Sequence, residues 1–228
     1  MSARSVCAVV VTYHPTPRMV DNLSATYSQV DAMVVIDNGS NCDSLERLRA
    51  AAGSLGFQLI ENGENLGIAE ALNLGVRWAM SQGHPWVILL DQDSTITEQF
   101  VERMFKAFEE APHPQTAAIV APTCVEADTG MKGRLMKSRR GEILTAMTSG
   151  SLIPTRVFDR TGLFETDLFI DYVDIEFCLR LRRQGMSILE SPAELRHFLG
   201  RTSSYRLLGL QFSATHHSPA RRYYITRN

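Results

Sequence analysis

The first 122 residues of the chain alternate between short apolar segments and longer segments with helical periodicity. The short segments are rich in Val, Ile and Leu, as buried strands are, and occupy residues 6–12, 32–37, 57–61, 86–91 and 117–121. The segments between them, at residues 18–29, 44–54, 67–82 and 98–111, repeat their apolar side chains at helical spacing. Regular alternation of this kind predicts an α/β fold, in which helices cover both faces of a mostly parallel, Rossmann-like sheet.

The alternation ends near residue 126. Residues 128–140 are polar and basic and indicate a long loop. Extended segments follow at 147–154 and 187–190, and helical segments at 155–161 and 171–184. We interpret residues 1–228 as a single domain, with a nucleotide-binding type of first half (1–122) and a divergent second half (123–228). The last residues, 218–228, look like a helix that has just begun, so we expect the chain to be truncated at its C-terminus.

The composition is that of an ordinary globular protein. Of the 228 residues, 44% are hydrophobic and 21% are charged, so the chain can bury a proper core. The net charge of −2 gives no reason to expect nucleic acid as a partner, and the apolar runs are too short to span a bilayer. The four cysteines have neither metal-ligand nor disulfide-framework spacing, which predicts reduced thiols in a cytoplasmic protein.

The fourth apolar segment ends in Asp91-Gln92-Asp93. Residues two apart on an extended backbone project to the same side. Both carboxylates would therefore converge at the carboxyl end of a strand, where open α/β sheets bind ligands. Two hard oxygen ligands suit Mg²⁺ or Mn²⁺ carrying a substrate diphosphate. The alternative is a turn and helix start at Asp93-Ser94, with Asp91 at a solvated strand end.

Two other apolar segments also end in polar residues, Thr12-Tyr13-His14 and Asp37-Asn38-Gly39-Ser40. In a parallel sheet these ends share one edge with Asp91. The carboxylate of Asp37 could accept a hydrogen bond from the imide N–H of a uracil or thymine ring. It could equally form an Asx turn ahead of Gly39.

The loop at residues 62–67 opens a predicted helix. Gly67 would permit close approach of the backbone, and helix amide groups attract phosphate oxygens. A plain loop with Asn65 as the helix N-cap is the simpler interpretation. The spacing matches neither a P-loop nor the dinucleotide-binding fingerprint, so simple nucleotide hydrolysis and NAD-dependent redox chemistry lose support.

Several carboxylates crowd into one apolar neighbourhood of the second half: Asp167, Asp171, Asp174 and Glu176. Asp171 and Asp174 are three residues apart, so on one helix they would share a face. Ile175 and Leu179 occupy positions for burial, which would turn some of these carboxylates toward a cleft. A helix cap favoured by the macrodipole would explain Asp171 alone.

His197 follows the extended segment at 187–190. A lone histidine is more often a structural residue than a metal ligand when only the sequence is known. Near the end of the chain Arg221, Arg222 and Arg227 are interleaved with tyrosines. They could bind phosphates or an anionic acceptor, or form a solvated basic helix face.

Taken in order, these segments resemble the family 2 glycosyltransferases of the GT-A fold, and among them the bacterial rhamnosyltransferases. The motifs that carry the resemblance extend over essentially the whole chain: Thr12-Tyr13-His14-Pro15, Asp37-Asn38-Gly39-Ser40, Glu64-Asn65-Leu66-Gly67 with Ala71-Leu72-Asn73, Asp91-Gln92-Asp93-Ser94, residues 148–153, residues 168–177 and residues 222–228.

The resemblance implies inverting transfer of a sugar from a nucleotide donor to an acceptor hydroxyl. It implies that the nucleotide or donor is bound by Thr12, Tyr13, Asp37, Asn65, Gly67, Asp91 and Gln92, that the metal is bound by Asp91, Asp93 and His197, and that the acceptor side is lined by Ser149 and Gly150. The general base would be Asp174. Many relatives have Glu-Asp where Val173-Asp174 stands, so Asp171 remains a rival for the base.

By resemblance the favoured donor is dTDP-L-rhamnose, and a UDP-hexose is the nearest alternative. The cofactor would be Mg²⁺ or Mn²⁺, and the acceptor a glycan or a lipid-linked sugar. Peripheral association with the inner face of the cell membrane would fit enzymes of this type. A glycoside hydrolase would also use two carboxylates, but it has no need for a nucleotide-base pocket. A non-catalytic nucleotide-sugar-binding module is a further alternative.

Overall fold

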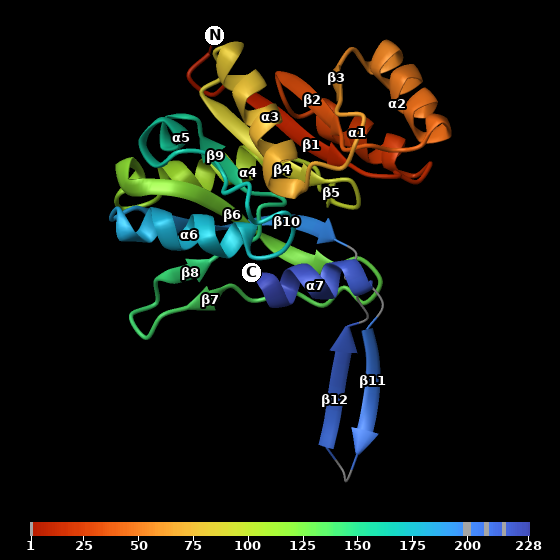
Figure 1. Ribbon diagram of the computed structural model, residues 1–228. Helices are drawn as coiled ribbons and strands as arrows, with labels where there is room; N and C mark the ends of the chain where they lie inside the picture. Colours follow the sequence, from red (N-terminus) through yellow and green to blue (C-terminus); the bar gives the residue numbers. More distant parts are fainter. Residues whose placement is uncertain (1, 198–201, 208–209, 216–217) are drawn as a thin grey trace.

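The computed structural model describes residues 2–197, 202–207, 210–215 and 218–228 (Figure 1). Its centre is a sheet of eight strands in the order β3-β2-β1-β4-β9-β6-β10-β5. These strands are β1 (Val6–Thr12), β2 (Ala32–Asp37), β3 (Gln58–Glu61), β4 (Trp86–Asp91), β5 (Thr95–Ile96), β6 (Ala117–Glu126), β9 (Leu152–Pro154) and β10 (Ser187–His197). Two separate hairpins are formed by β7 (Met136–Lys137) with β8 (Ile143–Thr145), and by β11 (Thr202–Leu207) with β12 (Leu210–Thr215).

Seven α-helices are assigned in the described part of the chain. They are α1 (Met19–Tyr27), α2 (Cys42–Leu55), α3 (Ile68–Ser81), α4 (Phe100–Glu109), α5 (Arg156–Thr161), α6 (Val173–Arg183) and α7 (Pro219–Arg227). A short 3₁₀ helix, Pro114–Thr116, leads into β6. The described helices include none long and apolar enough to cross a bilayer.

The first half of the sheet is parallel, as the alternation predicts. β1 pairs in parallel with both β2 and β4, and β2 pairs in parallel with β3. The chain therefore builds outward from β1 in one direction and then returns to add β4 on its other side. In open α/β sheets such a reversal of strand order leaves a crevice at the carboxyl ends of the two strands, and ligands bind there.

Alternate side chains of β1 enter the two hydrophobic layers that enclose the sheet. Val6, Ala8 and Val10 pack in the layer that contains α1, α2 and α4. Cys7, Val9 and Val11 pack in the layer that contains α3, α5 and α6. All seven residues of β1 are buried, which confirms the prediction of a fully buried strand.

Helix α3 lies unusually close to β1 because it has a glycine at the point of contact. A Cβ atom on Gly75 would lie 2.2 Å from Cγ1 of Val9. No side chain larger than hydrogen fits at this distance, so Gly75 sets the separation between helix and sheet.

The second half departs from the predicted elements in four places. β6 extends to Glu126, and β10 extends past residue 190 to His197 with two register shifts against β6. Residues 128–140 are mostly irregular, as predicted, but include β7. The predicted helix at 171–184 is wrong at its start, because α6 begins at Val173. Asp171 and Tyr172 precede it with φ angles of 64° and 63°, which a helix cannot accommodate.

All four cysteines are free. Burial raises the pKa of Cys7 to about 12 and that of Cys178 to about 11. Such thiols stay protonated and unreactive near neutral pH.

Candidate active site

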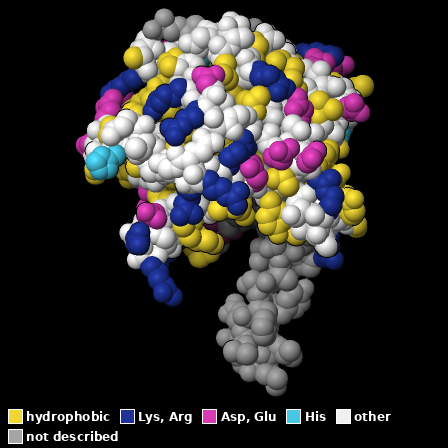
Figure 2. Space-filling model, turned by 60° about the vertical axis from the view of Figure 1, so that its left-hand side comes forward, with side chains coloured by type: hydrophobic (Ala, Val, Ile, Leu, Met, Phe, Trp, Pro, Cys, Tyr) yellow, Lys and Arg dark blue, Asp and Glu magenta, His cyan; other side chains and the backbone are white. Residues whose placement is uncertain are grey.

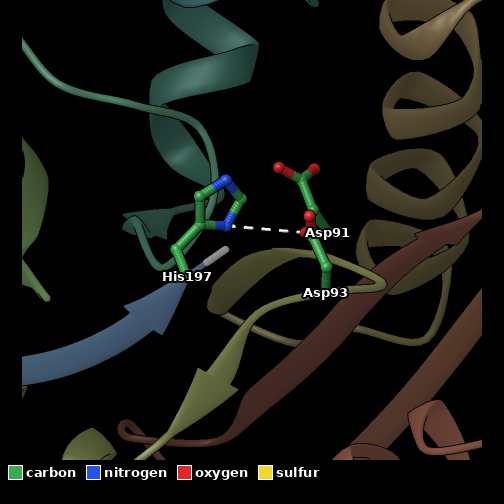
Figure 3. A group of neighbouring side chains, drawn as sticks. All are labelled: Asp91, Asp93 and His197. Atoms are coloured by element: carbon green, nitrogen blue, oxygen red, sulfur yellow. Dashed lines mark ion pairs between the residues drawn. The ribbon is translucent and has the colours of Figure 1, made fainter. Parts of the chain in front are cut away.

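Three predicted metal ligands lie together at the carboxyl edge of the sheet (Figure 3). Asp91 ends β4, and Asp93 follows it before β5. His197 ends β10, which pairs with β5 through Leu195 and Ile96. This pairing brings the imidazole beside Asp93. One ligand atom from each of the three residues lies within 4.8 Å of the others.

The two carboxylates differ in their environment. The side chain of Asp93 is 44% exposed, and its Oδ1 lies 3.5 Å from Nδ1 of His197, whose side chain is 17% exposed. Asp91 is more enclosed. Its removal from water, and then the neighbouring charge of Asp93, raise its pKa to about 6. The site thus concentrates negative charge that a cation would relieve.

The donor set fits a divalent cation. Two carboxylates supply hard oxygen ligands, which suit both Mg²⁺ and Mn²⁺. The imidazole of His197 adds a nitrogen ligand, which Mn²⁺ accepts more readily than Mg²⁺ does. Asp91, Asp93 and His197 would therefore hold the ion, with its remaining positions open to oxygen atoms of a substrate.

Two serines connect the metal ligands. The hydroxyl of Ser94 lies 2.9 Å from Nδ1 of His197 and 2.7 Å from the hydroxyl of Ser149. The Ser149 hydroxyl in turn accepts a hydrogen bond from the backbone N–H of Asp91 at 3.1 Å. Ser94 was not predicted as a site residue. Only its place beside Asp93 in the sequence could have indicated the supporting role that partners of metal ligands have.

Ser149 and Gly150 lie beneath this site, and their placement argues against the predicted acceptor contact. Ser149 is 1% exposed. The backbone N–H of Gly150 donates to the carbonyl of Leu89 at 2.7 Å. A Cβ atom on Gly150 would lie 2.7 Å from Pro122, so this glycine faces the protein interior.

Asp37, at the end of the neighbouring strand β2, forms the Asx turn that the sequence offered as the alternative to nucleobase binding. It is 1% exposed. Its Oδ1 accepts from the hydroxyls of Thr12, at 3.1 Å, and Ser40. Its Oδ2 accepts from the backbone N–H groups of Gly39, at 3.2 Å, and Ser40, at 2.9 Å. A nucleobase would have to share or replace one of these bonds, so base binding by Asp37 and Thr12 stays a prediction.

Tyr13 and Gln92 join the ends of β1 and β4. The backbone N–H of Tyr13 donates to Oε1 of Gln92 at 2.8 Å, and Nε2 of Gln92 donates to the carbonyl of Tyr13 at 3.1 Å. Tyr13 itself is 45% exposed. An exposed ring in this place can stack on a planar nucleobase.

Asn65 and Gly67 shape the loop before α3 through the chain itself. Asn65 Oδ1 accepts from the backbone N–H of Gly67 and from Nδ2 of Asn38, which was not predicted as a site residue. Gly67 has φ of 83°, and a Cβ atom there would lie 2.6 Å from the carbonyl oxygen of Phe169. The backbone at Gly67 is therefore closely approached, as predicted, but by the protein's own Phe169. The carbonyl of Phe169 accepts a hydrogen bond from the N–H of Ile68 at 2.8 Å.

The two candidate bases lie in different environments. Asp174 stands in the first turn of α6, where burial raises its pKa. Its negative charge also contributes to the raised pKa of Asp91, so the two carboxylates lie within electrostatic range of each other. Asp171 instead pairs with Arg221 in a two-pronged contact, at 2.8 Å to Oδ1 and 3.0 Å to Oδ2. Because both of its oxygens are engaged, Asp171 is the weaker candidate.

Helix α7 holds the segment that precedes α6. In addition to the Arg221 contact, the ring of Tyr224 stacks on Phe169 with 4.6 Å between centroids. Arg227 donates to the carbonyl of Asp167, and Nδ2 of Asn228 donates to the carbonyl of Ile170 at 2.9 Å. Of the three arginines that could bind phosphates or form a solvated helix face, Arg221 and Arg227 contact the protein's own segment before α6: Arg221 binds the Asp171 side chain and Arg227 the Asp167 carbonyl.

The outer face of α6 is more apolar than predicted. Ile175 and Leu179 are 38% and 45% exposed, so the prediction that they are buried is wrong. The residues that anchor α6 in the core are Val173, Phe177, Cys178 and Leu181. Glu176 turns outward to Arg180, with a shortest separation of 2.8 Å.

The protein thus combines an α/β fold with an acidic cluster at the carboxyl edge of its sheet. Residues 7–168 match the model of the family Glycosyl transferase family 2. The chain belongs to this family.

Curated relatives agree with the family assignment. The chain is 28% identical to the dTDP-rhamnosyl transferase RfbF of Shigella flexneri over 98% of its own length and 78% of the relative's. It is 22% identical to the low-salt glycan biosynthesis hexosyltransferase Agl10 of Haloferax volcanii, and 26% identical to the galactofuranosyltransferase GlfT1 of Mycobacterium tuberculosis. The chain spans only 63% and 66% of the length of these two proteins.

Solved structures show the same fold. TarS of Staphylococcus aureus, residues 1–349 in complex with UDP, matches 86% of this chain and 61% of its own with a TM-score of 0.69 and 14% identity. The mannosyltransferase PcManGT of Pyrobaculum calidifontis, in complex with GDP-Man and Mn²⁺, matches 82% of this chain and 54% of its own with a TM-score of 0.63 and 20% identity. These neighbours are GT-A glycosyltransferases, and the predicted GT-A fold is confirmed.

Proposed function

We propose that the protein transfers a sugar from a nucleoside diphosphate sugar to an acceptor hydroxyl, with inversion at the anomeric carbon. The observation that carries this proposal is the convergence of Asp91, Asp93 and His197 at the switch point of the sheet. A divalent ion held there would stabilise the negative charge of the departing diphosphate as a Lewis acid. Tyr13 and the turn around Asp37 lie at the ends of the neighbouring strands β1 and β2 and would receive the base.

Asp174 is the proposed general base. The attacking hydroxyl must lose its proton, and a positioned carboxylate that accepts it contributes roughly 10²–10⁴-fold. Burial raises the pKa of Asp174, which makes it a better proton acceptor than an ordinary aspartate. Arg221 and the rest of α7 would serve by holding the Asp167–Asp171 backbone, and thereby the start of α6, in place.

The donor we favour is dTDP-L-rhamnose. Its support is the similarity of nearly the whole chain to a dTDP-rhamnosyl transferase. A UDP-hexose is the alternative donor, because a solved neighbour of the same fold holds UDP-GlcNAc. The acceptor would be a hydroxyl of a glycan or of a lipid-linked sugar.

Calorimetric titration with dTDP, UDP and GDP, each with and without Mn²⁺, tests the proposal. We expect dTDP to bind in a metal-dependent manner, and Asp93→Asn to lose the metal dependence. Preference for UDP would keep the transferase and reject the rhamnosyl donor. Binding of dTDP without turnover of dTDP-L-rhamnose on any acceptor, water included, would favour a non-catalytic nucleotide-sugar-binding module. No binding of any nucleotide would refute the proposal.

A further inference from the structure

Residues 131–145 form a basic projection, here called the basic hairpin, which includes β7 and β8. They contain one acidic residue, Glu142, which pairs with Arg182 of α6 at 3.9 Å, and five basic residues: Lys132, Arg134, Lys137, Arg139 and Arg140. All five basic residues are exposed. In Figure 1 the β7–β8 hairpin extends away from the sheet beyond α6, and Figure 2 shows Lys and Arg side chains on a narrow projection at the lower left.

The basic hairpin also exposes apolar side chains. Met131 is 65% exposed and Met136 is 62% exposed, among the highest values for large hydrophobic residues in the described chain. Methionine is unbranched and flexible, so it can insert into an irregular apolar environment. Neither side chain serves the proposed metal site or the nucleotide crevice.

Contacts within the protein hold the basic hairpin in a defined position. Lys132 and Lys137 form ion pairs of 2.6 Å with Glu194 and Glu190 of β10. The backbone N–H of Gly133 donates to the carbonyl of Cys124 in β6 at 2.8 Å. The lysines are therefore used to anchor the hairpin to the sheet.

The three arginines of the basic hairpin are left for an outside partner. Among the described residues, no ion pair includes Arg134, Arg139 or Arg140. The whole chain has a net charge of −2, so an attraction to anions at this place comes from the local charge and not from the protein as a whole.

We propose that the basic hairpin docks the protein on an anionic lipid bilayer. Cationic side chains attract acidic headgroups, and apolar side chains beside them enter the boundary between headgroups and acyl chains. The arginines alone would also suit an anionic polysaccharide, but exposed methionines gain little there. The combination of both residue types favours the membrane surface. This inference goes beyond the proposed transferase activity and does not depend on it.

The expected effect follows from the number of free arginines. Each Lys or Arg near an anionic membrane surface changes the partition coefficient by about fivefold. Replacing Arg134, Arg139 and Arg140 by Gln should therefore reduce binding on the order of a hundredfold. Binding should also fall between 0.1 M and 1 M salt, because the screening length shrinks from about 10 Å to about 3 Å.

Sedimentation with vesicles tests the proposal. The full chain would be mixed with two kinds of vesicle. One is phosphatidylcholine with about a third phosphatidylglycerol, which is anionic, and the other is pure phosphatidylcholine, which is neutral. We expect binding to the anionic vesicles only, a loss in the triple Arg→Gln variant, and a weaker loss in Met131→Ser/Met136→Ser. A single-charge variant of the hairpin, Arg139→Gln, should lower vesicle binding about fivefold. Its matched control is Arg47→Gln, on the exposed face of α2, which should lower vesicle binding less than about twofold.

The outcomes separate this proposal from that of the enzyme. Titration with dTDP should give the same affinity for all the hairpin variants, since none touches the nucleotide crevice, and this also verifies their folding. Unchanged vesicle binding by the triple variant, or equal binding to neutral vesicles, would overturn the proposal. Binding to an anionic polysaccharide such as dextran sulfate but to no vesicle would assign the surface to a glycan instead. Failure of dTDP to bind would count against the transferase alone.

Discussion

Replacing Asp91 by Asn should stabilise the metal-free protein while it destroys the metal site. Removal of Asp91 from water, and the charge of Asp93, raise its pKa from 3.8 to about 6. The folded state therefore binds this proton more tightly than the unfolded state does. Above pH 6 the ionised carboxylate lowers the free energy of unfolding by its full amount. As the pH falls from 6 toward 3.8 the carboxylate becomes protonated in the folded state, and this destabilisation disappears.

The magnitude follows from the size of the shift. With these two pKa values the ionised carboxylate lowers the free energy of unfolding by up to ~3 kcal/mol at pH 7.5 and by up to ~2 kcal/mol at pH 5. Asn has nearly the same shape and no charge. We therefore expect Asp91→Asn to raise the free energy of unfolding by up to these amounts, and by more at pH 7.5 than at pH 5.

Urea unfolding in the presence of a chelator measures the effect, with the exposed Asp128→Asn as a control that should stay within ~0.5 kcal/mol of wild type. In a second series, Mn²⁺ should stabilise the wild type by ~2.7 kcal/mol at a hundred times its Kd, and Asp91→Asn not at all. A variant that is less stable than wild type, or a gain that does not change with pH, would refute the reasoning.

Three further predictions, two of them with a comparison variant, test other parts of the protein. Asp174→Asn should leave dTDP affinity near normal and lower turnover at least a hundredfold, on the order expected for a lost general base; if Asp171→Asn does this instead, Asp171 is the base. Gly67→Ala should destabilise the protein by at least ~1–3 kcal/mol in urea unfolding, because its φ is 83° and the new methyl group would lie 2.6 Å from the Phe169 carbonyl. Gly53→Ala, with open space around it in a helix, should be neutral or stabilising by up to ~1 kcal/mol. Ser94→Ala should weaken Mn²⁺ affinity ~10–100-fold in a calorimetric titration by releasing His197, and an unchanged affinity would show that His197 needs no such support.

Local pattern decided much of the fold. The apolar run at Val6–Thr12 is a fully buried strand with the predicted bounds. The strand Trp86–Asp91 also begins and ends at the predicted residues. Period and residue type report directly on backbone dihedrals and on the face that a side chain occupies. The same reasoning placed Asp91 and Asp93 at a strand end, because the order of strands and helices already predicts a parallel sheet.

Only the tertiary structure decided which distant residues meet. His197 lies 103 positions from Ser94 in the sequence, yet its imidazole contacts the Ser94 hydroxyl because β10 extends beyond the predicted 187–190 to pair with β5. Arg221 lies 50 positions from Asp171 and engages both of its oxygens, which sets Asp171 apart from Asp174. Periodicity could not show this, since a left-handed turn at Asp171 replaces the predicted helix start. Contacts of this kind depend on how loops close and helices pack over the whole domain, and no local pattern encodes them.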